Sequence, residues 1–180
     1  MAPTSKRTNI IKAACQLVRD KGASQLTLEA VAKEAGVSKG GLLYHFPSKD
    51  ALIKGIMDDL LDRFDLLTEE EASNNPELNN RWAQAYLLRT FMIEKEDLDF
   101  NVGFLAAAAT NPDLLGPMRA RYQIWQQRME VECADPVEAT VARLAGDGYF
   151  FCELFGLAPL DEQLKTRVMD YMLNMVKEGR

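Results

Sequence analysis

Apolar residues recur every three or four positions along almost the whole chain, which is the spacing of one face of an α-helix. A typical segment is the one from Lys6 to Lys21, with apolar residues at Ile10, Ile11, Ala14, Leu17 and Val18. No segment shows the sustained alternation of apolar and polar residues that indicates a half-buried β-strand. The pattern therefore predicts an all-α fold.

Capping and helix-breaking residues divide this pattern into nine expected helices. Gly22 and Gly36 each follow a helix, and Pro47 ends a third. The expected helices span residues 6–21, 27–35, 38–45, 49–71, 77–94, 97–110, 112–132, 136–155 and 161–178, with Thr27 and Ser38 as the N-caps of the second and third. The helix at 49–71 is long: at ~1.5 Å per residue it would extend roughly 33 Å.

Residues 27–49, TLEAVAKEAGVSKGGLLYHFPSK, predict a helix-turn-helix motif. Two short helices are joined by the turn Ala35-Gly36-Val37-Ser38, in which Gly36 can adopt a positive φ. Ala32 is small where the two helices would cross, and Val37 fills the space between them. In this motif the second helix enters the major groove of DNA.

The charge of the chain is unevenly distributed. Residues 1–50 contain eight Lys/Arg and four Asp/Glu, a net charge of +4. Residues 51–180 contain thirteen Lys/Arg and twenty-three Asp/Glu, a net charge of −10. The net charge of the whole chain is therefore −6. A basic first segment on an acidic remainder indicates that only the first segment approaches a polyanion such as DNA.

The composition narrows the class of protein further. The three cysteines, Cys15, Cys133 and Cys152, are widely spaced and show neither a disulfide framework nor a zinc-binding spacing, which indicates a reducing cytoplasm. No apolar run approaches the ~20 residues that a membrane-spanning helix needs. We therefore expect a cytoplasmic protein with no membrane segment, no metal and no cofactor.

From Ile10 to about Met57 the sequence closely resembles the TetR family of bacterial transcription regulators. The resemblance lies in the spacing of the first three helices, the Gly-Val-Ser turn and the Tyr-His-Phe-Pro-Ser-Lys ending. The last 120 residues resemble the family only in their helical architecture. The resemblance implies a helix-turn-helix DNA-binding domain at 1–48, joined by a long helix to a ligand-binding and dimerisation domain at 49–180.

The implied function is that of a sequence-specific repressor, released from a palindromic operator by a small, largely apolar effector. Lys39 can donate to guanine O6 and N7 or to a phosphate, and glycines beside it allow the backbone to approach the DNA. The residues expected to contact DNA are Thr27, Ser38, Lys39, Gly40, Gly41, Tyr44, His45 and Lys49.

Two residues depart from the family pattern. Leu43 stands where relatives often have a tyrosine that contacts a phosphate, which a leucine cannot do. Glu29 stands where relatives often have a basic residue near the DNA. A carboxylate there would repel phosphates, although it could accept a hydrogen bond from cytosine N4. The simpler interpretation is a solvated glutamate in the first turn of a helix.

Aromatic residues at helical spacing in the middle of the chain predict an apolar effector site with a few polar groups. Arg89, Asn101 and Gln126 are the candidate polar groups. The expected effector-site residues are Phe64, Trp82, Tyr86, Arg89, Phe100, Phe104, Tyr122 and Trp125. For each aromatic residue, packing in an ordinary core is the alternative.

The last two expected helices each carry one apolar face, and a pair of such helices repeated by a two-fold axis would form a four-helix bundle. The resemblance implies that this is the interface of a homodimer. The residues expected in it are Val141, Leu144, Gly148, Cys152, Phe155, Val168, Tyr171, Met172 and Met175. The alternative is that these faces close the core of a single chain.

Other functions are less consistent with the sequence. An enzyme is not expected, because the chain has one histidine and lacks a nucleophile motif, a phosphate-binding glycine loop and metal-ligand spacing. A redox-responsive regulator would use Cys133, which lies near a helix end. Activation by the ligand is a further alternative to repression. A purely architectural DNA-binding protein would need neither the acidic remainder nor the aromatic residues.

Overall fold

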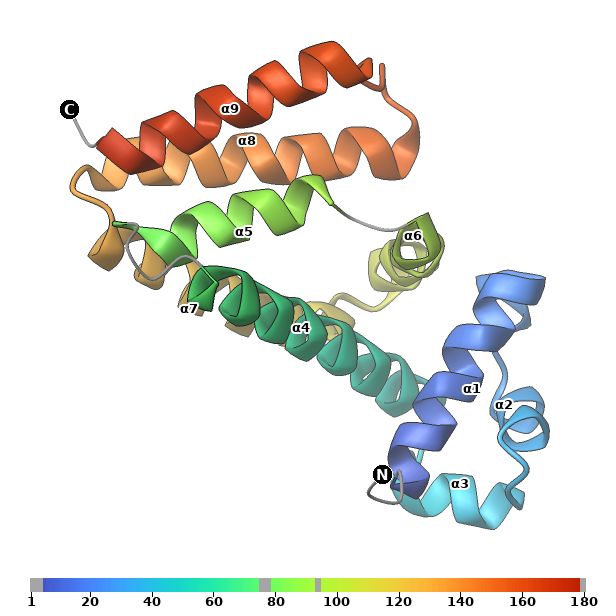
Figure 1. Ribbon diagram of the computed structural model, residues 1–180. Coiled ribbons are helices and arrows are strands. Elements are labelled where there is room, and N and C mark those ends of the chain that lie inside the picture. Colours follow the sequence, from blue (N-terminus) through green and yellow to red (C-terminus); the bar gives the residue numbers. More distant parts are fainter. Residues whose placement is uncertain (1–4, 75–78, 93–94, 179–180) are drawn as a thin grey trace. The chain divides into compact units, whose positions relative to one another are not determined.

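The computed structural model describes residues 5–74, 79–92 and 95–178, apart from the side chains of 95–100, 102, 106 and 178. All regular structure in these residues is helical, with nine α-helices and two 3-10 helices (Figure 1). The all-α fold predicted from the apolar pattern is confirmed.

The observed helices follow the expected ones closely. In chain order they are α1 (Lys6–Lys21), η1 (Ala23–Gln25), α2 (Leu28–Glu34), α3 (Lys39–His45), α4 (Lys49–Ser73), α5 (Arg81–Phe91), α6 (Lys95–Thr110), η2 (Pro112–Leu115), α7 (Gly116–Glu132), α8 (Pro136–Phe155) and α9 (Glu162–Glu178). The expected helix at 112–132 is divided into η2 and α7. Its first turn is the 3-10 turn η2, which the Asn111 side chain caps by accepting a hydrogen bond from the Asp113 backbone N–H.

The chain forms two compact units. The first comprises Met1–Leu61 and Lys95–Met118, and the second comprises Asp62–Glu94 and Arg119–Arg180. The boundary expected between residues 48 and 49 falls inside the first unit, which includes the first half of α4 as well as α6. The helix α4 is continuous from one unit into the other.

In the first unit, α1 packs against α2, η1 and α6, and α2 packs against α3. Its core includes side chains from the first four α-helices, among them Ile10, Val31, Leu42 and Ile56, each fully buried. The helix α6 approaches η1 so closely at Gly103 that a β-carbon there would overlap the side chain of Ala23. This close approach fixes α6 against the first three helices.

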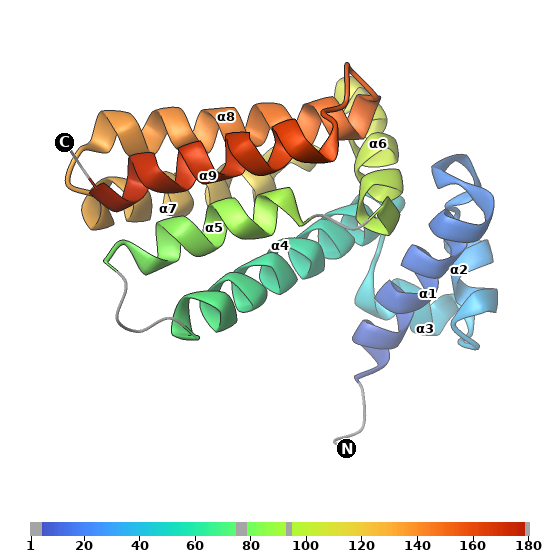
Figure 2. The same ribbon diagram turned by 45° about the horizontal axis from the view of Figure 1, so that its top comes forward.

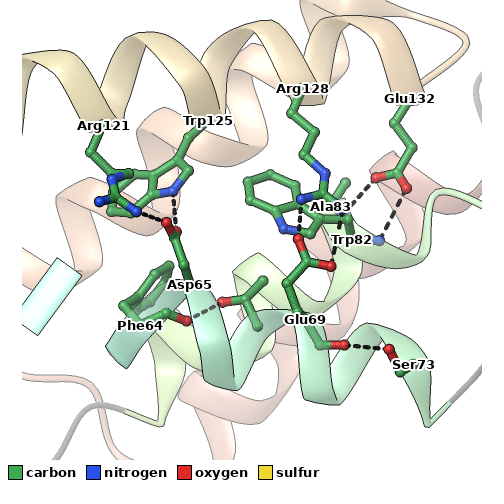
Figure 3. A network of polar contacts seen from close by, with 11 residues as sticks. Phe64, Asp65, Glu69, Ser73, Trp82, Ala83, Arg121, Trp125, Arg128 and Glu132 are labelled. Carbon is green, nitrogen blue, oxygen red and sulfur yellow. Dashed lines mark hydrogen bonds and ion pairs between the residues drawn. The ribbon is translucent and has the colours of Figure 1, made fainter. Parts of the chain in front are cut away.

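In the second unit, α5 packs against both α8 and α9, and these two long helices lie side by side (Figures 1 and 2). All α5 residues from Trp82 to Leu87 are buried. The second half of α4 is held to α7 by polar contacts (Figure 3). Among the described residues, no helix is long and apolar enough to cross a membrane.

Candidate nucleic-acid interface and candidate ligand site

The turn between α2 and α3 is built by local hydrogen bonds that the sequence predicts. The Thr27 hydroxyl caps α2 by accepting from the Ala30 N–H at 3.1 Å, and the Ser38 hydroxyl caps α3 by accepting from the Gly41 N–H at 3.0 Å. Gly36 lies between the helices with a φ of +64°, in the left-handed region that glycine favours. The two helices are therefore fixed as a helix-turn-helix.

The helix α3 has one face in the core and one face in solvent. Leu42 is completely buried in its middle, and Phe46, which directly follows the helix, is buried as well. Tyr44 has 84% of its surface exposed and packs edge-on against the half-buried His45. The expected DNA-contacting residues Thr27, Ser38, Lys39, Gly40, Gly41 and Lys49 are all exposed.

The two departures from the family pattern have different environments. Leu43 is half-buried. Glu29 is not merely solvated: its carboxylate pairs with the ammonium of Lys39 at 2.6 Å. The hydrogen bond from Lys39 is the main reason that the pKa of Glu29 is lowered. Lys39 at the start of α3 thus has an anionic partner, Glu29, on α2. Helical spacing alone does not predict this pairing.

In the second unit, five of the expected effector-site residues form one aromatic cluster. Neighbouring ring centroids in it are 5.0–5.5 Å apart, as in edge-to-face and tilted packing. The members of this aromatic cluster are Phe64, Trp82, Tyr86, Tyr122 and Trp125, contributed by α4, α5 and α7.

A half-buried ion pair borders the aromatic cluster. Asp147 accepts hydrogen bonds from the hydroxyls of Tyr86 and Tyr122, at 3.1 and 3.4 Å, and pairs with Arg143 at 2.5 Å. Arg143 in turn donates to the side chain of Gln126 at 2.5 Å. Burial raises the pKa of Asp147 despite these donors, and burial likewise raises the pKa of both tyrosines.

Sequence reasoning named Gln126 as a polar candidate but missed Asp147 and Arg143. The available signal was their spacing: an acidic and a basic residue four positions apart inside the most apolar of the long helices.

The other three expected effector-site residues lie elsewhere. Phe104 is buried in the first unit, and the side chain of Phe100 lies outside the described residues. Arg89 is on α5, one turn beyond Tyr86, and its Nε is buried without a hydrogen-bond partner. The structure thus brings together five of the eight predicted residues.

A second polar network lies between α4 and α7 (Figure 3). The Arg121 guanidinium pairs with Asp62 at 2.6 Å and also with Asp65, and the indole N–H of Trp125 donates to Asp65 at 2.7 Å. One turn further along α4, Glu69 pairs with Arg128, whose guanidinium lies 4.5 Å from the ring centroid of Trp82.

On the last two helices, large apolar side chains remain exposed. We call them the apolar face: Val137, Val141, Leu144, Phe151 and Phe155 on α8, with Leu164 and Tyr171 on α9. Of the other residues expected in a dimer interface, Gly148 is exposed and Cys152, Val168 and Met175 are half-buried. Met172 differs from expectation: it is buried inside the unit, within packing distance of Gly146, and does not belong to the apolar face.

Neither Cys133 nor Cys152 forms a disulfide. Cys133 is buried, and burial together with the nearby charge of Glu132 raises the pKa of its thiol to about 11. Because the thiolate is the form that reacts with oxidants, this environment disfavours Cys133 as a redox sensor.

Comparison with known proteins connects this arrangement to a family. A family model described as "Tetracyclin repressor-like, C-terminal domain" matches residues 80–177, which is more than half of the chain. A second, described as "Bacterial regulatory proteins, tetR family", matches residues 10–56, which contain the helix-turn-helix.

Curated relatives match over shorter stretches. The nucleoid occlusion factor SlmA of Marinomonas sp. (strain MWYL1) is 35% identical over 72 residues, which cover 38% of this chain and 36% of SlmA. The HTH-type transcriptional regulator RutR of Escherichia coli (strain K12) is 41% identical over 61 residues, which cover 34% of this chain and 29% of RutR. The matches thus span about a third of the length of these relatives.

Solved structures share the fold over nearly the whole chain. A transcriptional regulator from Rhodococcus sp. Rha1 has a TM-score of 0.77 at 18% identity, covering 97% of each chain. The multidrug binding protein EbrR in complex with malachite green has a TM-score of 0.71 at 22% identity, covering 96% of this chain and 99% of EbrR. Together with the two family models, the helix-turn-helix leads to the conclusion that the chain belongs to the tetR family of bacterial regulatory proteins, a family of DNA-binding transcription regulators rather than enzymes.

Proposed function

We propose that the protein is a homodimeric repressor that binds a palindromic operator and is released from it by a small, largely apolar effector. The observation that carries this proposal is the apolar face of α8 and α9. Leu144, Phe155 and Tyr171 on it are 55%, 51% and 70% exposed, although exposed side chains of this size are normally covered by a partner when they occur together.

A second copy of the chain is the partner that would give the apolar face a role in DNA binding. Two α8–α9 pairs related by a two-fold axis would form a four-helix bundle. The dimer would then present two helix-turn-helix motifs to two half-sites separated by one turn of DNA, ~34–36 Å. In each motif, we propose that the contacts come from the exposed residues at the starts of α2, α3 and α4, and from Tyr44 and His45.

The aromatic cluster is the proposed effector site. Five ring systems with one half-buried Asp–Arg pair provide the apolar surface and the few oriented polar groups that small-molecule sites use. EbrR, which shares the fold, was solved with the aromatic dye malachite green. Ligand binding that weakens operator affinity 5–150-fold would correspond to a coupling of about 1–3 kcal/mol, an ordinary value for allosteric proteins.

Selection of bound sequences from random duplex DNA by the purified protein tests the proposed operator. We expect an inverted repeat with half-site centres about 10 base pairs apart. Enrichment of a sequence without two-fold symmetry would contradict the dimeric docking.

The effector is tested with malachite green as a probe, because both tryptophans of the chain, Trp82 and Trp125, belong to the aromatic cluster. We expect the dye to change tryptophan emission and to weaken operator binding at least fivefold. A control titration of the dye with operator alone corrects for its binding to DNA. If dyes of this class change the emission but leave operator affinity unchanged, release by an aromatic effector is wrong, and increased affinity would favour activation.

Replacing Gly40 with alanine is expected to stabilise the protein while weakening its binding to DNA. A β-carbon at Gly40 would meet no atom of the protein within 4 Å, so the fold itself does not require glycine there. Alanine has the higher helix propensity, by up to about 1 kcal/mol. A methyl group between α3 and the base edges should lower operator affinity about tenfold, the size of one poor base contact.

Chemical denaturation and operator titration measure the two effects of Gly40→Ala. The matched control is Gly116→Ala, since Gly116 also starts a helix, is exposed and has open space where its β-carbon would be. Unchanged operator affinity in Gly40→Ala would show that this part of α3 does not lie against the DNA.

A further inference from the structure

Lys39, the first residue of α3, forms an ion pair with Glu29, the second residue of α2, at the surface of the first unit. Lys39 Nζ lies 2.6 Å from Glu29 Oε1, and the two side chains are 59% and 65% exposed. Both residues therefore keep most of their surface free for another molecule. Because α2 and α3 pack against each other across the Gly36 turn, the pair joins two helices of the helix-turn-helix.

We propose that Glu29 and Lys39 together recognise one G·C base pair in each operator half-site. Lys39 donates to O6 and N7 of the guanine, and Glu29 accepts from the N4 amino group of the cytosine. This inference rests on the proposed docking of α3 in the major groove.

The hydrogen-bonding pattern of the Glu29–Lys39 ion pair matches the major-groove edge of a G·C base pair and not that of an A·T base pair. From the purine outward, a G·C pair presents two acceptors, N7 and O6, followed by the donor N4. An A·T pair presents an acceptor, a donor and an acceptor in the same places. An ammonium that spans two acceptors, with a carboxylate directly beside it, is complementary only to the first pattern.

The spacing of the pair is also suitable. Cytosine N4 and guanine O6 are hydrogen-bonded to each other across the base pair, so they lie about 2.9 Å apart. The Lys39 nitrogen and the Glu29 oxygen are separated by a similar distance, 2.6 Å. Each group of the protein can therefore face one group of the base pair without separating from its own partner.

The Glu29 carboxylate makes the contact with DNA selective. Lys39 without this carboxylate would bind DNA with less sequence preference. An exposed lysine binds any phosphate, and this interaction contributes affinity without sequence preference. Glu29 competes with phosphates for the ammonium and repels them. Only at a base edge that also offers a donor does the carboxylate gain a hydrogen bond in return, so Glu29 lowers binding to other sequences more than binding to the operator.

The test compares wild type with Glu29→Met and Lys39→Met in selection from random duplex DNA, followed by titration of the selected operator. For wild type we expect a G·C position in each half-site whose replacement by A·T weakens binding about tenfold. In Glu29→Met this preference should fall to about twofold or less, and affinity for random duplex should rise several-fold as one negative charge is lost. Lys39→Met should lose the same preference and bind all duplexes more weakly.

Glu34→Met is the matched control, because Glu34 is an exposed carboxylate at the other end of α2. It should retain the wild-type preference at every position. If Glu29→Met retains the wild-type preference, the inference is overturned while the proposed operator binding stands. If wild type itself enriches no sequence, the proposed docking fails. Both variants change only exposed side chains, and helical circular dichroism verifies that the fold is retained.

Discussion

Leu144→Asp is expected to convert the protein into a monomer and to lower its operator affinity at least 100-fold. Leu144 is 55% exposed at the centre of the apolar face of α8, between Val141 and Phe151. In a four-helix bundle this position would be enclosed, and a carboxylate buried there without a partner costs several kcal/mol. The substitution should leave the single chain folded, because the side chain is half in solvent without the partner.

The loss of affinity follows from the loss of the second helix-turn-helix motif. In a dimer, the second motif binds its half-site in an intramolecular step. Such linkage raises overall affinity by 10²–10⁴-fold over that of a single motif. Sedimentation and operator titration on the same samples measure both effects. Val131→Asp is the control, since Val131 is an 87% exposed apolar residue on α7 that is not part of the apolar face. A Leu144→Asp protein that remains dimeric at micromolar concentration would contradict the proposed interface.

The parts of the fold that were predictable from sequence are those fixed by neighbouring residues. The turn at Gly36 and the caps at Thr27 and Ser38 depend on hydrogen bonds within three to five positions, and each was expected at the residue where it occurs. The exposed face of α3 follows from the same local pattern, since burying Leu42 leaves Tyr44 in solvent.

The start of α5 could not be predicted, because a distant residue determines it. The apolar pattern predicts a helix from residue 77, whereas α5 begins at Arg81. Its first free N–H groups, those of Trp82 and Ala83, donate to the carboxylate of Glu132 on α7 at 3.2 and 2.8 Å (Figure 3). A cap supplied from 50 residues away leaves no signal in the local sequence.

The candidate sites in the second unit show the same limit. Helical spacing identifies which side chains share a face, but not which other helix that face meets. Met172 shares an apolar face of α9 with residues expected in the dimer interface, yet it packs inside the unit beside Gly146. Likewise Phe104 resembles the members of the aromatic cluster in sequence but lies in the core of the other unit.

Arg121→Met is expected to destabilise the protein by about 2 kcal/mol. Arg121 is 23% exposed and pairs with both Asp62 and Asp65, the latter 30% exposed. Methionine preserves the apolar stem but leaves the partly buried carboxylate of Asp65 with the Trp125 indole as its remaining donor. Breaking a fully buried pair in this way costs 3–5 kcal/mol, and access of solvent to both partners reduces the expected value.

Urea denaturation measures the effect, with Arg119→Met as the matched control. Arg119 lies two residues away on α7 and is exposed, so its replacement should change stability by no more than about 0.5 kcal/mol. Asp65→Asn should cost much less in the Arg121→Met background than in wild type, because the two residues act as one unit. Equal losses in both backgrounds would show that the pair contributes no coupling.

The same variant connects stability to the proposed regulation. Trp125 belongs both to the aromatic cluster, where its ring lies 5.1 Å from Phe64, and to the polar network, where it donates to Asp65. An effector that displaces the indole would therefore also remove a contact that holds α4, the helix that continues into the DNA-binding unit. If release from the operator proceeds in this way, Arg121→Met should weaken operator binding even without effector and reduce the further response to it. An unaltered response to malachite green in this variant would show that the signal does not pass through the anchoring of α4 to α7.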